Sequence, residues 1–132
     1  VAVNCGPALM GDDIEGICQS VMDIPVCVSD ASGFNGDADR GWSDAMISLL
    51  RKVPHFSEKK QAGKINVIGQ CILDPASDES WENVLFIPGG QLMTYGELSL
   101  LSEAERNVVV HPRGLAVARW LEENTQVPYS IQ

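Results

Sequence analysis

Basic side chains are scarce in this chain. Its 132 residues include nine Lys and Arg against 18 Asp and Glu, which gives a formal net charge of −9 at pH 7. Such an acidic chain lacks the cationic surface with which proteins neutralise a phosphate backbone. We therefore expect no nucleic-acid partner.

Long hydrophobic runs are also missing. No apolar stretch approaches the roughly 20 residues that a membrane-spanning helix needs. An export signal has a basic segment followed by an apolar one, and this sequence shows no such pattern. We therefore expect a cytoplasmic protein with no membrane partner.

The cysteines show no local pairing. They stand at Cys5, Cys18, Cys27 and Cys71, without a CxxC pair or a zinc-type spacing. This spacing predicts neither a metal knuckle nor a disulfide framework. Cys18 and Cys27 fall among apolar residues of a predicted helix and strand, where we expect them in the core.

Short apolar runs alternate with amphipathic or turn-rich segments. The predicted strands are 1–3, 24–28, 65–69, 84–87, 107–110 and one that begins at 127. The predicted helices are one that begins at about Asp13, 42–53, a short one after Thr94, and 115–124. This alternation favours an α/β fold with Rossmann-like parallel sheets flanked by helices. The acidic, turn-rich segment 72–83 fits either a loop or a shortened crossover.

The composition changes once near the middle of the chain. Residues 54–63 are polar and contain Pro and Gly between apolar segments, which is typical of a linker. We predict that residues 1–53 are the end of a first Rossmann-like domain and residues 64–132 the start of a second. The chain is then a fragment of a longer protein.

The segment 5–15, Cys-Gly-Pro-Ala-Leu-Met-Gly-Asp-Asp-Ile-Glu, places a thiol in the turn before a helix. Asp12 and Glu15 have the spacing of an acidic N-cap and its reciprocal partner. Taken alone, this pattern leaves two readings of Cys5. It is either a small buried thiol or a sulfur presented to a ligand.

Two polar segments follow predicted strands, where open α/β sheets bind ligands. One is the loop 29–41, and the other is the turn 111–114. His111 could bind a metal ion as neutral imidazole, or could hydrogen bond to nearby backbone. Arg113 could hold an anionic group or could be solvated.

Three stretches together carry the pattern of a known family. The first is the segment 5–15, the second is Gly-Phe-Asn-Gly at 33–36 followed by Gly-Trp at 41–42, and the third comprises the strands and turns between 64 and 129. They resemble the nitrogenase component 1 type oxidoreductases. The resemblance implies the end of one Rossmann-like domain, a linker and the beginning of the next.

The resemblance also implies roles for single residues. Cys5 matches a cysteine that ligates an iron–sulfur cluster at a subunit interface. Gly33 stands where some beta-type subunits have a cluster-ligating serine, with Ser32 beside it. His111 lies close to where the alpha subunit of nitrogenase has a cysteine ligand to its iron–molybdenum cofactor, and Arg113 follows it.

The function implied is that of a nitrogenase-like oxidoreductase subunit. Its complete form would hold an iron–sulfur cluster at a subunit interface and pass electrons to a reducible substrate or an assembling metallocofactor. The partners would be a homologous subunit and an ATP-dependent iron–sulfur reductase. The remaining cluster ligands would come from upstream of Val1 and from the partner subunit, so we expect no cluster and no activity in this chain alone.

A second interpretation belongs to a different class. The loop 29–41 and the turn 111–114 could form the pocket of a non-catalytic α/β module that binds a small ligand or a protein. Two further cysteines in glycine-rich turns upstream would favour the cluster, and their absence would favour the binding module.

Overall fold

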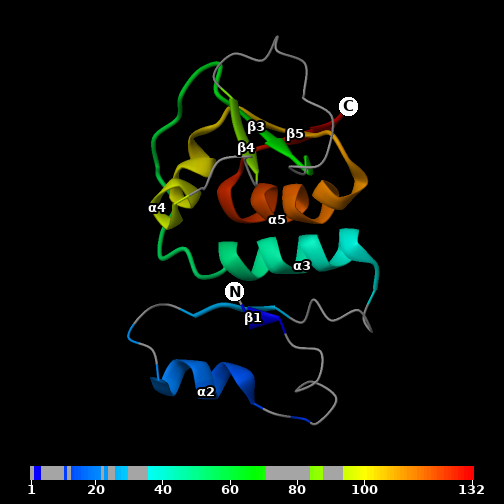
Figure 1. Ribbon diagram of the computed structural model, residues 1–132. Helices are drawn as coiled ribbons and strands as arrows, with labels where there is room; N and C mark the ends of the chain where they lie inside the picture. Colours follow the sequence, from blue (N-terminus) through cyan, green and yellow to red (C-terminus); the bar gives the residue numbers. More distant parts are fainter. Residues whose placement is uncertain are drawn as a thin grey trace. The chain divides into compact units, whose positions relative to one another are not determined.

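The computed structural model describes residues 2–3, 11, 13–21, 23, 26–29, 36–70, 84–87 and 94–132. The chain divides into two compact units, Val1–Pro54 and His55–Gln132. Helices and parallel strands occur in both, which confirms the predicted α/β class (Figure 1). No helix in the described ranges is long and apolar enough to cross a membrane.

The described part of the first unit contains a small parallel sheet and two helices. Its elements are β1 (Ala2–Val3), α2 (Ile14–Val21), β2 (Val28–Ser29) and α3 (Ala38–Leu50), with β1 paired to β2. The N-cap of α2 is Asp13, because its Oδ1 accepts a hydrogen bond from the Gly16 amide at 2.9 Å. The predicted cap, Asp12, was therefore wrong by one residue.

Helix α3 begins four residues before its predicted start at Trp42. Asp37 is extended, and its Oδ1 accepts from the Arg40 amide at 3.0 Å. This bond satisfies one of the free amides of the first turn and fixes the start of the helix at Ala38. Residues 38–41, predicted as loop, are therefore helical.

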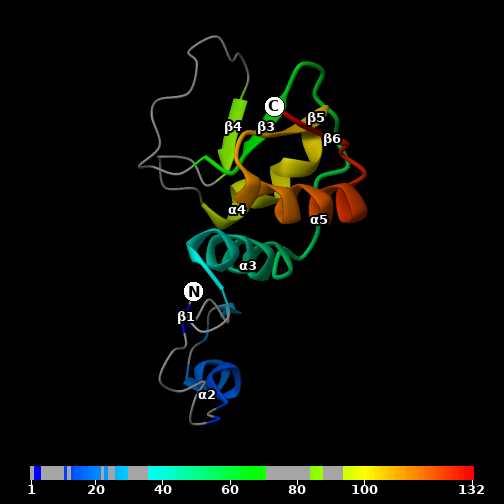
Figure 2. The same cartoon turned by 90° about the vertical axis from the view of Figure 1, so that its right-hand side faces the viewer.

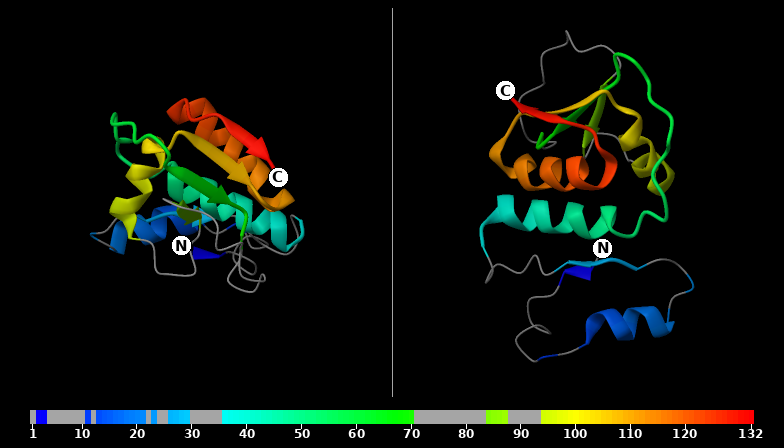
Figure 3. Two further views of the ribbon diagram at one scale, coloured as in Figure 1. Left: turned by 90° about the horizontal axis from the view of Figure 1, so that it is seen from above. Right: turned by 180° about the vertical axis from the view of Figure 1, so that it is seen from behind.

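The second unit contains a four-stranded parallel sheet within the described residues. Its strands are β3 (Ile65–Ile68), β4 (Val84–Ile87), β5 (Arg106–Val109) and β6 (Tyr129–Ile131), in the order β4-β3-β5-β6. Its helical elements are α4 (Tyr95–Leu98), η1 (Ser99–Glu103), η2 (Pro112–Gly114) and α5 (Leu115–Thr125). Helix α5 runs along one face of this sheet (Figures 2 and 3).

The core of the second unit lies between this sheet and its helical elements. Its buried apolar side chains are Val67, Ile68, Leu98, Leu101, Ala104, Val108, Val109, Val117, Ala118, Leu121 and Val127. Helix α4 begins with the predicted capping pair, because the Thr94 backbone amide donates to Glu97 Oε2, and the Thr94 hydroxyl donates to the same oxygen at 2.8 Å. The hydrogen bond from the Thr94 backbone amide first, and then that from its hydroxyl, lower the pKa of Glu97.

Two buried amides lie opposite each other in this core. Asn66 of β3 and Asn107 of β5 are in register and fully buried. Asn66 Nδ2 donates to Asn107 Oδ1 at 2.9 Å and to the Leu101 carbonyl at 2.8 Å, and Asn107 Nδ2 donates to the Val127 carbonyl at 2.9 Å. The amides thus join η1, both central strands and the connection from α5 to β6. Such paired amides fix strand register, because a one-residue slip would leave buried polar groups unsatisfied.

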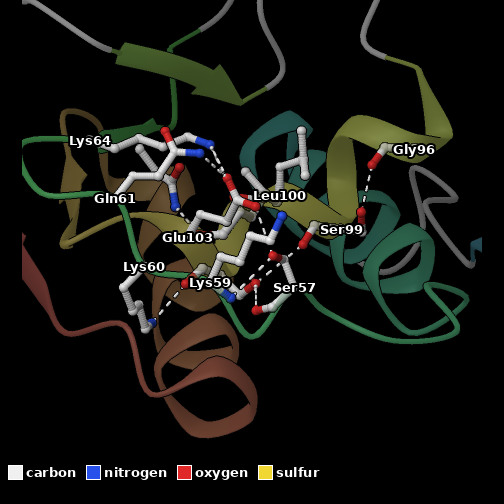
Figure 4. Close-up of polar contacts among 12 residues, drawn as sticks. Ser57, Lys59, Lys60, Gln61, Lys64, Gly96, Ser99, Leu100 and Glu103 are labelled. Atoms are coloured by element: carbon white, nitrogen blue, oxygen red, sulfur yellow. Dashed lines mark hydrogen bonds and ion pairs between the residues drawn. The ribbon is translucent and has the colours of Figure 1, made fainter.

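Residues 57–64, here named the clasp segment, run along η1 (Figure 4). The Ser57 amide donates to the Ser99 carbonyl at 2.9 Å, and the Gln61 amide donates to the Glu103 carbonyl at 2.8 Å. These polar residues, which predicted a linker, thus belong to the second unit and pair with η1.

Glu103 of η1 accepts most of the side-chain hydrogen bonds from the clasp segment, and it is 4% exposed. Its carboxylate accepts from the Ser57 hydroxyl at 2.7 Å, from the Lys64 ammonium at 3.0 Å and from the Gln61 side-chain amide. The Ser57 hydrogen bond first, and then Lys64, lower the pKa of Glu103. The buried carboxylate is therefore held in its charged form.

Candidate functional site

The carboxyl edge of the second sheet contains a topological switch point. Strands β3 and β5 are the two central strands, and the chain leaves β3 for β4 on one side and β5 for β6 on the other. In open α/β sheets, ligands bind outside the carboxyl ends of the strands at such a point. The residues that follow these strands, Gly69 and His111, therefore define the candidate site.

Two glycines bring the backbones together at this edge. Gly69 has a φ of +101°, and a Cβ on it would lie 2.9 Å from the carbonyl oxygen of His111. A Cβ on Gly114 would lie 2.7 Å from the carbonyl oxygen of Ile68. Any larger residue at either position would push the turn after β5 away from the end of β3.

The turn after β5 leads directly into helix α5. His111 is extended and precedes η2, and the Gly114 amide donates to the His111 carbonyl at 2.9 Å. Pro112 suits the first position of this turn because it has no amide to satisfy. The first turn of α5 therefore starts at the carboxyl edge, and its free amides favour negative charge there.

His111 and Arg113 are in direct contact, and both are half-buried. The Arg113 Nε donates to His111 Nδ1 at 2.9 Å, and the Arg113 backbone amide also contacts Nδ1 at 3.4 Å. The Arg113 Nη2 lies 3.2 Å from His111 Nε2. Since Nδ1 accepts, a neutral imidazole carries its proton on Nε2. The pair combines a guanidinium, which binds oxyanions, with an imidazole, which binds metal ions.

The four predicted site residues fall into two groups. The structure brings His111 and Arg113 together at the carboxyl edge. Cys5 and Gly33 lie outside the described residues, so their roles stay predictions. Within the described residues, no three His, Cys, Asp or Glu side chains gather as a metal site would require.

The part of the chain that the structure describes contains the cysteines Cys18 and Cys27. Cys27 is buried as predicted, and burial raises the pKa of its thiol. Cys18 was expected in the core, but it is only half-buried on α2, so that prediction was wrong. A raised pKa keeps a thiol protonated, and the thiolate is the form that binds metal. Cys27 is therefore a poor ligand.

Sequence reasoning missed Gly69 as a site residue. The signal was present, because a glycine directly after an apolar strand often marks a close backbone approach. Its partner, Gly114, lies 45 positions later, and no local pattern joins the two.

Comparisons with known proteins place the chain in a family. The family model described as nitrogenase component 1 type oxidoreductase matches residues 1–131. The nitrogenase iron-molybdenum cofactor biosynthesis protein NifE of Klebsiella pneumoniae is 28% identical over 150 aligned positions, which cover 96% of this chain and 32% of the relative.

A solved structure described as "Nitrogenase Cp1 at pH 6.5" shares the fold, with a TM-score of 0.59 and 14% identity. The match covers 94% of this chain and 34% of that one. The chain thus spans about a third of the length of these relatives. Because the family model matches nearly every residue, this protein belongs to the nitrogenase component 1 type oxidoreductases.

Proposed function

We propose that the complete polypeptide is a subunit of a nitrogenase-like oxidoreductase or of a complex that assembles its metallocofactor. Cys5 would ligate an iron–sulfur cluster at the interface with a homologous partner subunit. The family match over residues 1–131 carries this proposal, and the likeness to NifE supports the assembly branch.

A single thiolate does not complete such a site. A cubane cluster is held by about four thiolates or substitutes. Among the described residues no metal-ligating trio exists, so the other ligands would come from the rest of the polypeptide and from the partner. Electrons would come from an ATP-dependent iron–sulfur reductase, and the complex would act in the cytoplasm.

The second part of the proposal concerns the metallocofactor that would be used or assembled, as distinct from the iron–sulfur cluster at Cys5. His111 and Arg113 lie at the switch point of the second sheet, where open α/β sheets bind ligands, and they would contact the metallocofactor there. Gly33, which follows β2 in the chain, would contribute a backbone position to the cluster region of the first unit. The reaction would be a reduction of a substrate, or of a metallocofactor during its assembly.

Anaerobic reconstitution of the full-length protein with its partner subunit tests the cluster. Cys5→Ala is compared with Cys18→Ala, since Cys18 is a half-buried thiol of the same unit outside the motif. We expect Cys5→Ala to lower the iron content and the visible absorbance of the cluster, while Cys18→Ala retains both. Circular dichroism of both variants checks that they fold.

Unchanged iron content in folded Cys5→Ala would show that Cys5 is not a ligand. The carboxyl edge of the second sheet would then be the remaining candidate site, as in the binding-module interpretation. Titration of that edge with small ligands would separate the two functions.

A further inference from the structure

We propose that the clasp segment, residues 57–64, is a latch that electrostatic charge keeps closed. The ionised carboxylate of Glu103 holds the segment on η1, and loss of that charge releases it while the sheet of the second unit stays folded. The inference goes beyond the proposed function, and it depends on neither a cluster nor a metallocofactor.

Polar contacts hold the clasp segment on η1 (Figure 4). The Ser57 hydroxyl donates to Glu103 Oε1 at 2.7 Å, and the Lys64 ammonium donates to Oε2 at 3.0 Å. The Gln61 side-chain amide donates to the same Oε2. The backbone amides of Ser57 and Gln61 also donate to carbonyls of η1. One carboxylate therefore accepts hydrogen bonds from three side chains of the segment.

Apolar burial contributes little to this attachment. Residues 58–63 are all exposed, and Ser57 and Lys64 are only half-buried. The apolar core at η1 consists of side chains outside the segment, such as Leu98 and Leu101. A segment with few buried apolar contacts opens at a lower free energy than the core beside it. The clasp segment can therefore open while the sheet stays folded.

Loss of the Glu103 charge weakens these contacts together. An ionised carboxylate only accepts hydrogen bonds, whereas a protonated carboxyl group also carries a donor, which would face the donors of the segment. The charged groups that act on Glu103 are Lys64 and Lys59, and both favour the ionised form. Glu105 lies beside them, and its carboxylate accepts from the Gly63 amide at 2.9 Å. The latch is therefore closed at neutral pH, and it opens as the pH falls below the ordinary glutamate pKa of 4.5.

The latch accounts for a linker-like sequence that is docked in the structure. Residues 54–63 are polar and contain Pro and Gly, as a flexible connection does, yet residues 57–64 are bound to η1. When the latch is open, the stretch from Val53 to β3 would keep the aromatic contact of Phe56 with Trp120, whose ring centroids are 6.0 Å apart. The same residues thus give a fixed connection when Glu103 is charged and a flexible one when it is neutral.

Hydrogen–deuterium exchange of the full-length protein, measured by mass spectrometry, tests the latch. One peptide covers the clasp segment and another covers β5, so both are followed in the same sample. The wild type and Glu103→Gln are compared at pH 7 in several urea concentrations below the unfolding transition. Glu58→Gln is the matched control, because it removes the same charge from an exposed glutamate of the clasp segment.

We expect the clasp peptide of the wild type to exchange several-fold faster than the β5 peptide. Its rate should depend only weakly on urea, because a local opening exposes little surface. Glu103→Gln should raise the clasp rate several-fold, and Glu58→Gln should leave it unchanged. In the wild type, the clasp rate relative to the intrinsic amide rate should rise below about pH 4.5, and Glu103→Gln should remove most of that rise.

Either of two results overturns the latch. The clasp rate could rise with urea as steeply as the β5 rate, which would mean that the segment opens only when the unit unfolds. Folded Glu103→Gln could also exchange like the wild type. A second pair of variants, Lys64→Met and Lys59→Met, removes one ammonium each, but only Lys64 contacts Glu103 in the structure at 3.0 Å. Lys64→Met should accelerate the clasp peptide more, and equal rates in the pair would contradict the role of charge.

Discussion

Helices α2 and α5 occupy the same position in their units. Each connects two neighbouring parallel strands, β1 to β2 and β5 to β6. Helix α5 buries Val117, Ala118 and Leu121 completely. Helix α2 buries no residue, and its Ile17 and Val21 are 55% and 75% exposed.

The difference comes from the sheets and not from the helices. Both sequences are amphipathic, but in the described residues β1 and β2 each have two residues, whereas α5 packs on β3, β5 and β6. A short two-stranded ribbon offers little apolar surface to a helix. An amphipathic pattern thus specifies a helix, and the neighbouring sheet decides whether its apolar face is buried.

This contrast bears on the two parts of the proposed function. Cys5 precedes the exposed helix, and His111 precedes the buried one. The Cys5 test needs the full-length complex, because the described residues contain no metal-ligating trio and the other cluster ligands would come from elsewhere.

We expect the largest effect when an apolar side chain is truncated in each of the two helices. Leu121→Ala should lower the free energy of unfolding by about 2–5 kcal/mol, because it leaves a cavity beneath α5. Ile17→Ala should change it by less than about 1 kcal/mol, because that side chain is largely in water already. Urea unfolding followed by circular dichroism measures both. Equal losses would show that the apolar face of α2 is packed.

A second prediction concerns charge in the unit that carries α5. Glu103 has a lowered pKa when folded, so its stabilising contribution is present above the ordinary glutamate pKa of 4.5. This contribution is lost as the pH falls through the lower pKa that Glu103 has in the folded state. Glu103→Gln should therefore unfold at a lower urea concentration than the wild type at pH 7. The difference should shrink as the pH falls below about 4.5.

Glu58→Gln is the matched control for this prediction. Glu58 is an exposed glutamate of the clasp segment, and its replacement changes the net charge equally. We expect a much smaller change of the urea midpoint at pH 7. If both variants lost the same stability, overall charge and not the clasp would explain the effect.

Local signals explain which parts of this fold were predictable. Strand β4 has the predicted bounds, and α5 ends one residue after its predicted end, because each is an apolar or amphipathic run between clear turn residues. The start of α3 was wrong because three glycines and three aspartates in 29–41 suggested a loop. One of those aspartates, Asp37, is instead the cap.

Long-range contacts explain what could not be predicted. Glu103 meets Ser57 and Lys64 across 46 and 39 positions, and no local pattern joins them. The pairing of Asn66 with Asn107 likewise depends on strand order. His111 and Arg113 were predicted because they stand in the turn after a strand and because His111 lies near a cofactor-ligand position of the family that the chain resembles. The contact between their side chains required the geometry of η2.

The smallest expected effect concerns an ion pair of the first unit. Lys52 Nζ lies 3.1 Å from Glu15 Oε1 on α2, and their side chains are 37% and 51% exposed. The pair Lys64–Glu103 has almost the same distance, 3.0 Å, but its side chains are 16% and 6% exposed. Water and salt screen the first pair far more than the second.

A double-mutant cycle of Lys52→Ala and Glu15→Ala should therefore give a coupling of about 0.2–1 kcal/mol at low salt, decreasing in 1 M NaCl. Urea unfolding of the four proteins measures it. Glu15 also accepts from Gln19 at 3.0 Å, so part of the single-variant loss belongs to that bond and cancels in the cycle. A salt-independent coupling well above this range would mean that the pair is shielded from solvent. The exposed character of α2, on which the contrast with α5 depends, would then be wrong.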